Sequence, residues 1–357
     1  MPIPGTRAAL SFVFRSSKVW QNHGSLLNMA RSDQINPVRF AAVLLSMMLG
    51  TAIPSWGWGA QRVELDNGDV YEGDMIDGVR TGQGVYVWAD GKRYEGDFLD
   101  NKLHGEGVFT EPGRTYTGGF VNDRRQGSGR LAWQNGDLYA GDFHNDEMHG
   151  HGVFTWGNKD RYEGDFVRGA RTGRGTFTWS AGATYTGTFA DGILTGQGVY
   201  TWPDDRRYEG EFVDGIKTGI GSLEWSNGNR YYGQFARGYR QGLGVFYWRD
   251  GTIYRGQFLR DKMHGHGVKQ QPDGFMELQH WDSGDLLLNI PLLERVNCRL
   301  QMDGRGWMFT GTECVNGIAH GVGLAVSLDG KYVIEDGHYV LGRRIDGERQ
   351  LLDLDQG

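Results

Sequence analysis

Aromatic residues and glycines recur along most of this chain with a period of 23 residues, broken by one spacing of 22. The pattern Tyr-x-Gly-x-Phe, or a near variant, is followed eleven residues after its tyrosine by Gly-x-Gly in every copy, and seventeen residues after it by Trp in seven of nine copies. A fixed period of this length is typical of repeat proteins. The nine copies begin at Tyr71, Tyr94, Tyr116, Tyr139, Tyr162, Tyr185, Tyr208, Tyr231 and Tyr254.

Each copy is predicted to form a β-hairpin. Side chains alternate along a strand, so the Tyr, Gly and Phe at offsets 0, 2 and 4 share one side, as do the residues at offsets 11, 13, 15 and 17. In the first copy, residues 76–81 are predicted to form the loop of the hairpin, and residues 89–91 the link to the next copy. Folding the hairpin puts a bare glycine beside each large ring, so we expect the rings to lie across backbone that has no Cβ.

Stacked hairpins of this kind predict an all-β protein, an elongated open antiparallel β-meander about 85 Å long. A lone hairpin is marginally stable in water, whereas neighbouring copies can share their aromatic rows. Val63 and Leu65 fit half a repeat before Tyr71, which predicts a strand that covers the first edge. The composition agrees, because 59 glycines disfavour long helices, while 12 Trp, 16 Tyr and 17 Phe are too many for a disordered chain. With 8 prolines and no Gly-X-Y period, collagen is excluded.

The repeat resembles that of MORN-repeat proteins of the bacterial exported type, whose unit reads Tyr-Glu-Gly-Asp/Glu-Phe, then Gly-x-Gly, Trp and Gly. Residues 94–98, 162–166 and 208–212 carry the first part almost letter for letter. The resemblance implies stacked MORN-type hairpins with a scaffolding or binding role. Some members of the family are reported to bind phospholipid or to dimerise, and others carry a catalytic domain beside the repeats. We expect residues 61–274 to hold the half repeat and the nine repeats.

Residues 1–60 are predicted to be a leader rather than part of the fold. Phe40 to Ile53 is an uncharged apolar run of 14 residues, preceded by Arg31 and Arg39 and followed by small residues. This order is typical of a signal peptide and predicts an exported, periplasmic or extracellular protein, with Met29 as a possible true start. The alternative is an uncleaved segment that anchors the protein in a membrane.

The charge of the chain argues against nucleic acid as a partner. The net charge is −7, and residues 61–357 hold 32 basic and 43 acidic residues. A body this acidic is a poor match for a polyanion unless basic residues gather locally. Such a gathering is predicted in the hairpin loops, where stacking would align cations along one edge. The sequence offers two readings of this edge, solubility or binding of an anionic lipid headgroup or glycan. The candidate basic edge consists of Arg124, Arg125, Arg168, Arg171, Arg237 and Arg240.

The aromatic side of the hairpins is the other predicted binding surface, for a protein partner or a second copy of the chain. The candidate binding face consists of Tyr94, Phe98, Trp133, Tyr139, Trp156, Tyr162, Trp179, Tyr208 and Trp225.

Catalytic and metal sites have little support in the sequence. The carboxylates of Arg-x-Glu-x-Asp/Glu, as in residues 93–97, recur from copy to copy and are predicted to be solvated ion pairs, whereas a catalytic pair occurs once. Histidines such as His149 and His151 lack a third ligand at a suitable spacing. Gly-x-Gly is not followed by a third glycine that opens a helix, which disfavours dinucleotide binding. We therefore expect a non-enzymatic scaffold without cofactor or metal.

Residues 275–357 are predicted to be a degenerate, repeat-like C-terminal β cap. Phe309-Thr-Gly311 followed by Gly321-Val-Gly323 looks like a decayed repeat with one extra residue. Cys298 and Cys314 lie 16 residues apart, and in an exported chain we expect them to form a disulfide worth about 3 kcal/mol. An enzyme seated in this tail is the remaining alternative, and its 83 residues leave little room for one.

Overall fold

The computed structural model describes residues 60–292, 298–315, 318–340 and 342–352. Within these residues all regular structure is β-strand, which confirms the predicted all-β class. The predicted leader, with its apolar run, lies outside the described residues. Twenty-one strands form one sheet and six form a second, smaller sheet.

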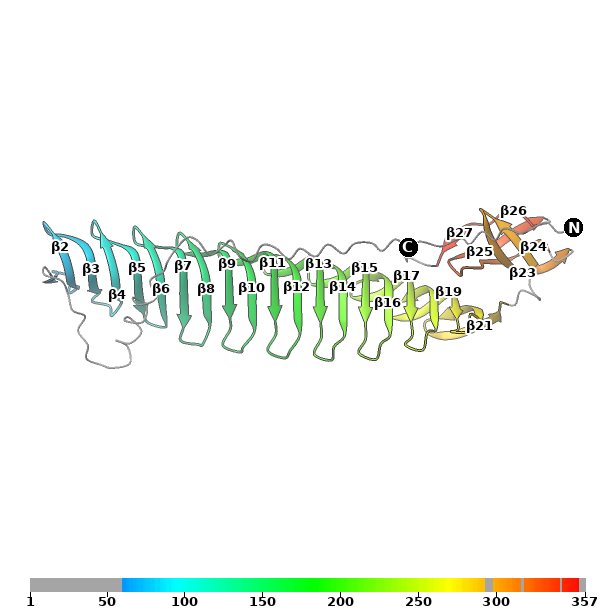
Figure 1. The fold of residues 1–357 in the computed structure, drawn as a ribbon, viewed down its shortest axis with the longest axis horizontal. Coiled ribbons are helices and arrows are strands. Elements are labelled where there is room, and N and C mark those ends of the chain that lie inside the picture. Colours follow the sequence, from blue (N-terminus) through cyan, green and yellow to red (C-terminus); the bar gives the residue numbers. More distant parts are fainter. Residues whose placement is uncertain (1–59, 293–297, 316–317, 341, 353–357) are drawn as a thin grey trace, which may run out of the picture. The chain divides into compact units, whose positions relative to one another are not determined.

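The large sheet is an antiparallel meander in which each strand pairs with the strands before and after it in the chain (Figure 1). It is open, since among the described residues β1 pairs only with β2 and β21 only with β20. Its strands are β1 (Ala60–Glu64), β2 (Val70–Ile76), β3 (Val79–Val87), β4 (Arg93–Leu99), β5 (Lys102–Glu111), β6 (Arg114–Val121), β7 (Arg124–Trp133), β8 (Leu138–His144), β9 (Glu147–Thr155), β10 (Arg161–Val167), β11 (Ala170–Thr178), β12 (Thr184–Ala190), β13 (Ile193–Thr201), β14 (Arg207–Val213), β15 (Ile216–Glu224), β16 (Arg230–Ala236), β17 (Tyr239–Tyr247), β18 (Ile253–Leu259), β19 (Lys262–Gln270), β20 (Met276–Asp282) and β21 (Asp285–Pro291).

The hairpin turns are tighter than the predicted loops. Ile76 pairs with Val79, so Asp77 and Gly78 alone connect β2 to β3, with φ values of 51° and 80°. Two positive φ values in a two-residue loop are what a type I′ turn requires, and its twist matches that of the flanking strands. Later repeats use the same geometry, as at Asn145 (φ 48°) and Asp146 (φ 71°). The predicted six-residue loop is therefore wrong.

A bulge in the second strand of each hairpin compensates for the short turn. Gly73 pairs with Gly84, but Met75 pairs with Arg80, so β3 carries two extra residues between these pairs. The short turn leaves the residue nine positions after the repeat tyrosine in the second strand, on the aromatic side and opposite the residue at the Phe position. Because two residues are inserted, parity is the same before and after the bulge, and offset 9 shares its side with offsets 13, 15 and 17.

Glycines form an unbroken row across the large sheet, from Gly73 to Gly267, and each pairs with the next. The row ends at Gln61 on one side and Gln279 on the other. Each repeat tyrosine lies over two of these glycines. A Cβ on Gly175, for example, would lie 2.6 Å from Cε2 of Tyr162. The expectation that rings lie across bare backbone is confirmed.

Tyrosines and phenylalanines form the core of the sheet as one continuous series. Tyr139 contacts Phe143 of its own repeat at 5.2 Å between ring centroids and Phe166 of the next repeat at 5.1 Å, both edge-to-face. Edge-to-face contacts of this kind contribute about 0.5–1.5 kcal/mol beyond burial. The repeat tyrosines from Tyr94 to Tyr231 each bridge two hairpins in this way, so neighbouring repeats stabilise one another.

The large sheet extends one hairpin beyond the predicted boundary at residue 274. β20 and β21 continue the meander, with Trp281 opposite Gly265, where a repeat Phe lies in other copies. The six-stranded sheet follows and repeats some of the same devices. Gly311 pairs with Gly323, and the register shifts before Glu313, as in the repeats. Its strands are β22 (Cys298–Met302), β23 (Arg305–Val315), β24 (Ile318–Ser327), β25 (Tyr332–Val340), β26 (Arg343–Asp346) and β27 (Arg349–Leu351).

Candidate functional site

The tyrosines and phenylalanine of the candidate binding face are core residues. Tyr94, Tyr139, Tyr162 and Tyr208 are 0% exposed and Phe98 is 4% exposed. The prediction that they meet a partner is wrong, because each tyrosine lies over the glycine row and its edges are covered by phenylalanines. Burial disfavours the tyrosinate and raises the pKa of Tyr162 to about 12.

The tryptophans of the candidate face remain half-buried and accessible. They pack on the core from the end of each repeat, where they form a row with the residue two positions before them, which is Phe at Trp156 and Trp179 and Leu at the other two. Phe177 contacts Trp156 at 5.3 Å and Trp179 at 4.5 Å between ring centroids. The same row continues from Trp179 to Tyr200 and Trp202. Aromatic side chains that are partly wet are common in protein-binding surfaces. The four predicted members are Trp133, Trp156, Trp179 and Trp225.

The candidate basic edge is not one surface. Arg124, Arg168 and Arg237 are exposed at or beside the hairpin turns, as predicted. The other three predicted members lie on the aromatic face, because the two-residue turn leaves the residue nine positions after the tyrosine in the second strand, opposite the Phe position. They are Arg125, Arg171 and Arg240.

Cations at this ninth position stack on aromatic rings of two repeats. The guanidinium carbon of Arg171 lies 5.5 Å from the ring centroid of Trp156 and 5.6 Å from that of Tyr162. Nζ of Lys217 lies 5.3 Å from Trp202 and 5.5 Å from Tyr208. Such cation–π contacts contribute about 0.5–2 kcal/mol each. Both cations were expected in the hairpin loops, and they lie in the strands instead. Asp214-Gly215, just before Lys217, is a signal that could have corrected the expectation, because an Asp-Gly pair predicts a two-residue type I′ turn.

These cations differ in how their charge is balanced. Arg125 donates to Asp146 Oδ1 at 3.3 Å and to its carbonyl oxygen at 2.7 Å, and Arg240 is bound to Asp261 in the same way at 3.1 Å and 2.5 Å. Among the residues that the structure describes, Arg171, at the equivalent place, donates only to the carbonyl oxygen of Gly192, at 3.1 Å.

Lys217 has fewer polar partners than these arginines, because no hydrogen bond or ion pair to it is found within the residues that the structure describes. Desolvation on burial lowers the pKa of both Arg171 and Lys217.

On the opposite face of the sheet the carboxylates are already partnered. Arg161 donates to Glu163 at 2.6 Å, and the same pair recurs at Arg207 and Glu209. Oδ2 of Asp165 accepts the backbone N–H of Arg174 at 3.2 Å, which holds the bulge. The predicted solvated ion pairs are confirmed, with the added finding that the second carboxylate serves the backbone.

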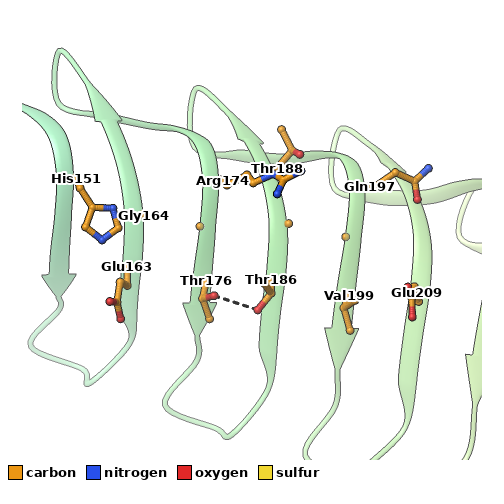
Figure 2. A pocket seen from close by; sticks show the side chains of 13 residues that line it. His151, Glu163, Gly164, Arg174, Thr176, Thr186, Thr188, Gln197, Val199 and Glu209 are labelled. Carbon is orange, nitrogen blue, oxygen red and sulfur yellow. Dashed lines mark hydrogen bonds between the residues drawn. The ribbon is translucent and has the colours of Figure 1, made fainter. Parts of the chain in front are cut away.

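A shallow cavity of about 720 Å³ lies on this opposite face, over the glycines of β10 to β13. Figure 2 shows its side chains in two rows, with the glycine backbone between them. One row contains Thr176 and Thr186, whose hydroxyls lie 3.0 Å apart. The cavity offers hydroxyl, amide and charged groups in a repeating order, without a nucleophile and base in contact. The labelled side chains are His151, Glu163, Arg174, Thr176, Thr186, Thr188, Gln197, Val199 and Glu209.

Histidines and cysteines supply no metal centre in the described ranges, where no group of three or more His, Cys, Asp or Glu side chains is arranged to hold an ion. Instead, Nδ1 of His266 lies 2.5 Å from a Glu335 carboxylate oxygen. Cys298 is buried at 3% exposure in β22. The side chain of Cys314, in β23, lies outside the described residues, so the disulfide stays a prediction. In the described part of the chain, no helix has the length and apolar character needed to cross a membrane.

Comparisons with known proteins agree with the repeat pattern. The family model described as MORN repeat matches residues 71–93, 94–111, 116–138, 139–161, 162–184, 185–205, 208–230, 231–253 and 254–276. A comparison with curated proteins found no match.

Solved structures similar to this chain include two Drosophila melanogaster domains. The SAS-4 (dCPAP) TCP domain, in complex with a proline-rich motif of Ana2 (dSTIL), is 17% identical with a TM-score of 0.30, over 43% of this chain and 84% of that one. The TCP10c domain of Sas-4 is 18% identical with a TM-score of 0.29, over 44% and 93%. A streptogramin B lyase is 12% identical with a TM-score of 0.13, over 84% and 95%. Scores this low carry no argument about function.

Proposed function

Because this chain belongs to the MORN-repeat family, we propose that it is a non-enzymatic scaffold that binds another protein through its aromatic face. One observation supports the proposal above others. The tyrosines and phenylalanines are buried in the core, whereas a row of half-buried tryptophans and stacked cations remains accessible along the same face. Aromatic and arginine side chains are the residues that most often dominate binding energy at interfaces.

The geometry of the described residues favours binding over chemistry. The carboxylates of the opposite face are held by arginines and by the bulge N–H groups, and they repeat along the sheet. An enzyme needs one place where an acid, a base or a nucleophile is set apart. A scaffold instead benefits from the repetition.

Selection of peptides from a random library on purified full-length protein tests the scaffold. We expect families of related peptides that bind the wild-type chain and lose affinity when Trp156 and Trp179 are changed to Ala. Binding that survives this double change while failing in a variant of the opposite face, such as Thr176→Ala with Thr186→Ala, would move the surface to the other side. If no peptide family is enriched and sizing with cross-linking shows only a monomer, the scaffold proposal is wrong.

Binding to an anionic lipid or glycan is the second candidate function. It is favoured by the exposed Arg124, Arg168 and Arg237 at the hairpin turns. Charge reversal of these three residues would abolish sedimentation with anionic vesicles at low salt, while leaving binding of a protein partner unchanged. Vesicle binding that is insensitive to the reversal and to salt contradicts this candidate.

Export of the chain, with cleavage of the leader, is also proposed. Its support is the apolar run of residues 40–53 between basic and small residues. The mass of the protein recovered from the cell envelope or the medium distinguishes a cleaved leader from a retained anchor. In an oxidising compartment Cys298 and Cys314 would form a disulfide, which peptide mapping with and without reductant would detect.

A further inference from the structure

The residue at the end of each hairpin turn decides whether the stacked cation of the preceding repeat is neutralised. Asp146 and Asp261 occupy this place beside Arg125 and Arg240. In the repeats between them the turn ends in glycine, as at Gly192, which has no side chain to offer. Within the described ranges, the middle of the sheet thus carries cations without a carboxylate partner.

Arg171 and Lys217 are the two cations in this condition. Both are half-buried among rings of the aromatic face. Other charged groups near Lys217 are Arg206, Arg240 and Asp261, and the first two repel it. Asp261 attracts it but is bound to Arg240. A partly desolvated cation without a counter-charge costs stability, and an incoming anion would relieve that cost.

The spacing of the site fits an extended chain. Arg171 lies in β11 and Lys217 in β15, four strands further along the meander, or about 19 Å at the usual strand separation. Six residues of a polyproline II helix also span about 19 Å. The tryptophan row repeats every second strand, about 9.6 Å apart, and one turn of the same helix advances about 9.3 Å. A peptide that crosses the strands in this conformation therefore matches both the spacing of the two cations and the spacing of the tryptophans.

We propose that the aromatic face between β11 and β15 binds an acidic, proline-containing segment of a partner protein, with two carboxylates about six residues apart at Arg171 and Lys217. The proposal rests on the scaffold function and names the partner's chemistry. The prolines lie between the tryptophans, since preformed polyproline II segments dock on aromatic-lined surfaces at low entropic cost. Arg125 and Arg240, already bound to carboxylates, mark the limits of the acidic site.

The experiment measures the anisotropy of a fluorescent peptide of about twelve residues, proline-rich, with two glutamates six positions apart. Control peptides carry glutamines instead, or the two glutamates two positions apart. The protein is the full chain, as wild type and as three double variants. Arg171→Gln with Lys217→Gln removes both charges, Arg171→Lys with Lys217→Arg keeps them, and Arg168→Gln with Arg237→Gln removes two exposed turn cations instead. Circular dichroism of each variant checks that the sheet is retained.

We expect the six-spaced peptide to bind at least about tenfold more tightly than either control peptide, with affinity that falls as salt rises. The charge-removing variant loses that difference, the charge-keeping variant retains most of it, and the turn variant changes it by less than about twofold. Equal binding of the three peptides, or equal loss in the two charge-removing variants, overturns the proposal. If anionic vesicles compete for the same site with the same dependence on Arg171 and Lys217, the ligand is a lipid surface and the peptide proposal is wrong.

Failure of this proposal is distinguishable from failure of the scaffold. If the random library yields peptides that bind the tryptophan row but lack paired acidic residues, the scaffold stands and the acidic site falls. If the library yields nothing and sizing with cross-linking shows only a monomer, both fall.

Discussion

Gly175 is the position where the link between repeat sequence and fold can be measured most cleanly. A Cβ at this glycine would lie 2.6 Å from both Cε2 and the hydroxyl of Tyr162, closer than any carbon contact tolerates. The backbone φ is not in the left-handed region, so Gly175→Ala introduces the clash without backbone strain. The tyrosine ring must move, and its edge-to-face contacts with Phe166 at 5.2 Å and Phe189 at 5.0 Å are disturbed.

The expected cost of Gly175→Ala is about 3 kcal/mol. Overpacking accounts for about 1–3 kcal/mol, and the two ring contacts add about 0.5–1.5 kcal/mol each if they are lost. The matched control is Gly215→Ala, a turn glycine with φ of 75° and no atom within 4 Å of the added Cβ. That change suffers only left-handed strain, about 1–2 kcal/mol.

The assay is hydrogen exchange of the full chain, followed by mass spectrometry of peptides from β10 to β12. Exchange is preferred over a global melting curve, because repeat arrays open locally and are not two-state. Gly175→Ala should raise exchange in its own and adjacent repeats and leave β3 and β4 unchanged. In a Tyr162→Leu background the cost of Gly175→Ala should fall by at least about 1 kcal/mol. If Gly175→Ala costs no more than Gly215→Ala, the ring does not lie over the glycine row and the reasoning fails.

Three further predictions follow from charge, ionisation and thiol chemistry. Lys217→Met should change thermal stability little, because the loss of cation–π contacts is offset by removal of a half-buried cation that has no ion pair among the described residues. Arg240→Met should lower stability by about 1–3 kcal/mol, because it breaks an ion pair and its hydrogen bonds. Differential scanning calorimetry measures both changes, and equal effects would contradict the difference in charge balance. The pKa of Tyr162 is about 12 in the folded protein, above its unfolded value of about 10. Its contribution to stability is therefore complete below pH 10 and is lost as the pH rises toward 12. Far-UV circular dichroism and tyrosinate absorbance should change together in that window, and tyrosinate that forms near pH 10 with the sheet intact would contradict the burial of the ring. Reduction of the predicted disulfide between Cys298 and Cys314 should raise hydrogen exchange in β22 and β23 but not in β10. The double change Cys298→Ser with Cys314→Ser should reproduce the effect, and unchanged exchange would argue against a disulfide.

The sequence was enough to predict the repeat units and which of their residues share one side of the strand, because strand parity and glycine spacing are local properties. Tyr162, Gly164 and Phe166 fall on one side as their offsets require, and Gly175 pairs with Gly164 as the ring contact demands. The half repeat was readable for the same reason, since Val63 pairs with Tyr71 in β1 and β2. Each of these follows from a period of two along a strand.

The place of the basic residues was missed because the hairpin loop was expected to span six residues, which put offset 9 of each repeat in the loop and not in the second strand. Arg124 and Arg125 are adjacent in the chain, yet one is an exposed turn residue and the other stacks 5.4 Å from Phe143. Which cations lack a counter-charge depends on contacts 21 residues away, such as that between Arg125 and Asp146. Such contacts become visible only when the stacking of repeats is known.

Hydroxyl-radical footprinting of the full chain is the measurement that tests the central claim most directly, since it reports tyrosine and tryptophan accessibility in one experiment. The account predicts strong oxidation of Trp156 and Trp179 and none at Tyr139 and Tyr162, with protection of the tryptophans when the six-spaced acidic peptide is bound. Oxidation of the tyrosines at rates similar to the tryptophans, or tryptophans that stay reactive in the presence of saturating peptide, would contradict it.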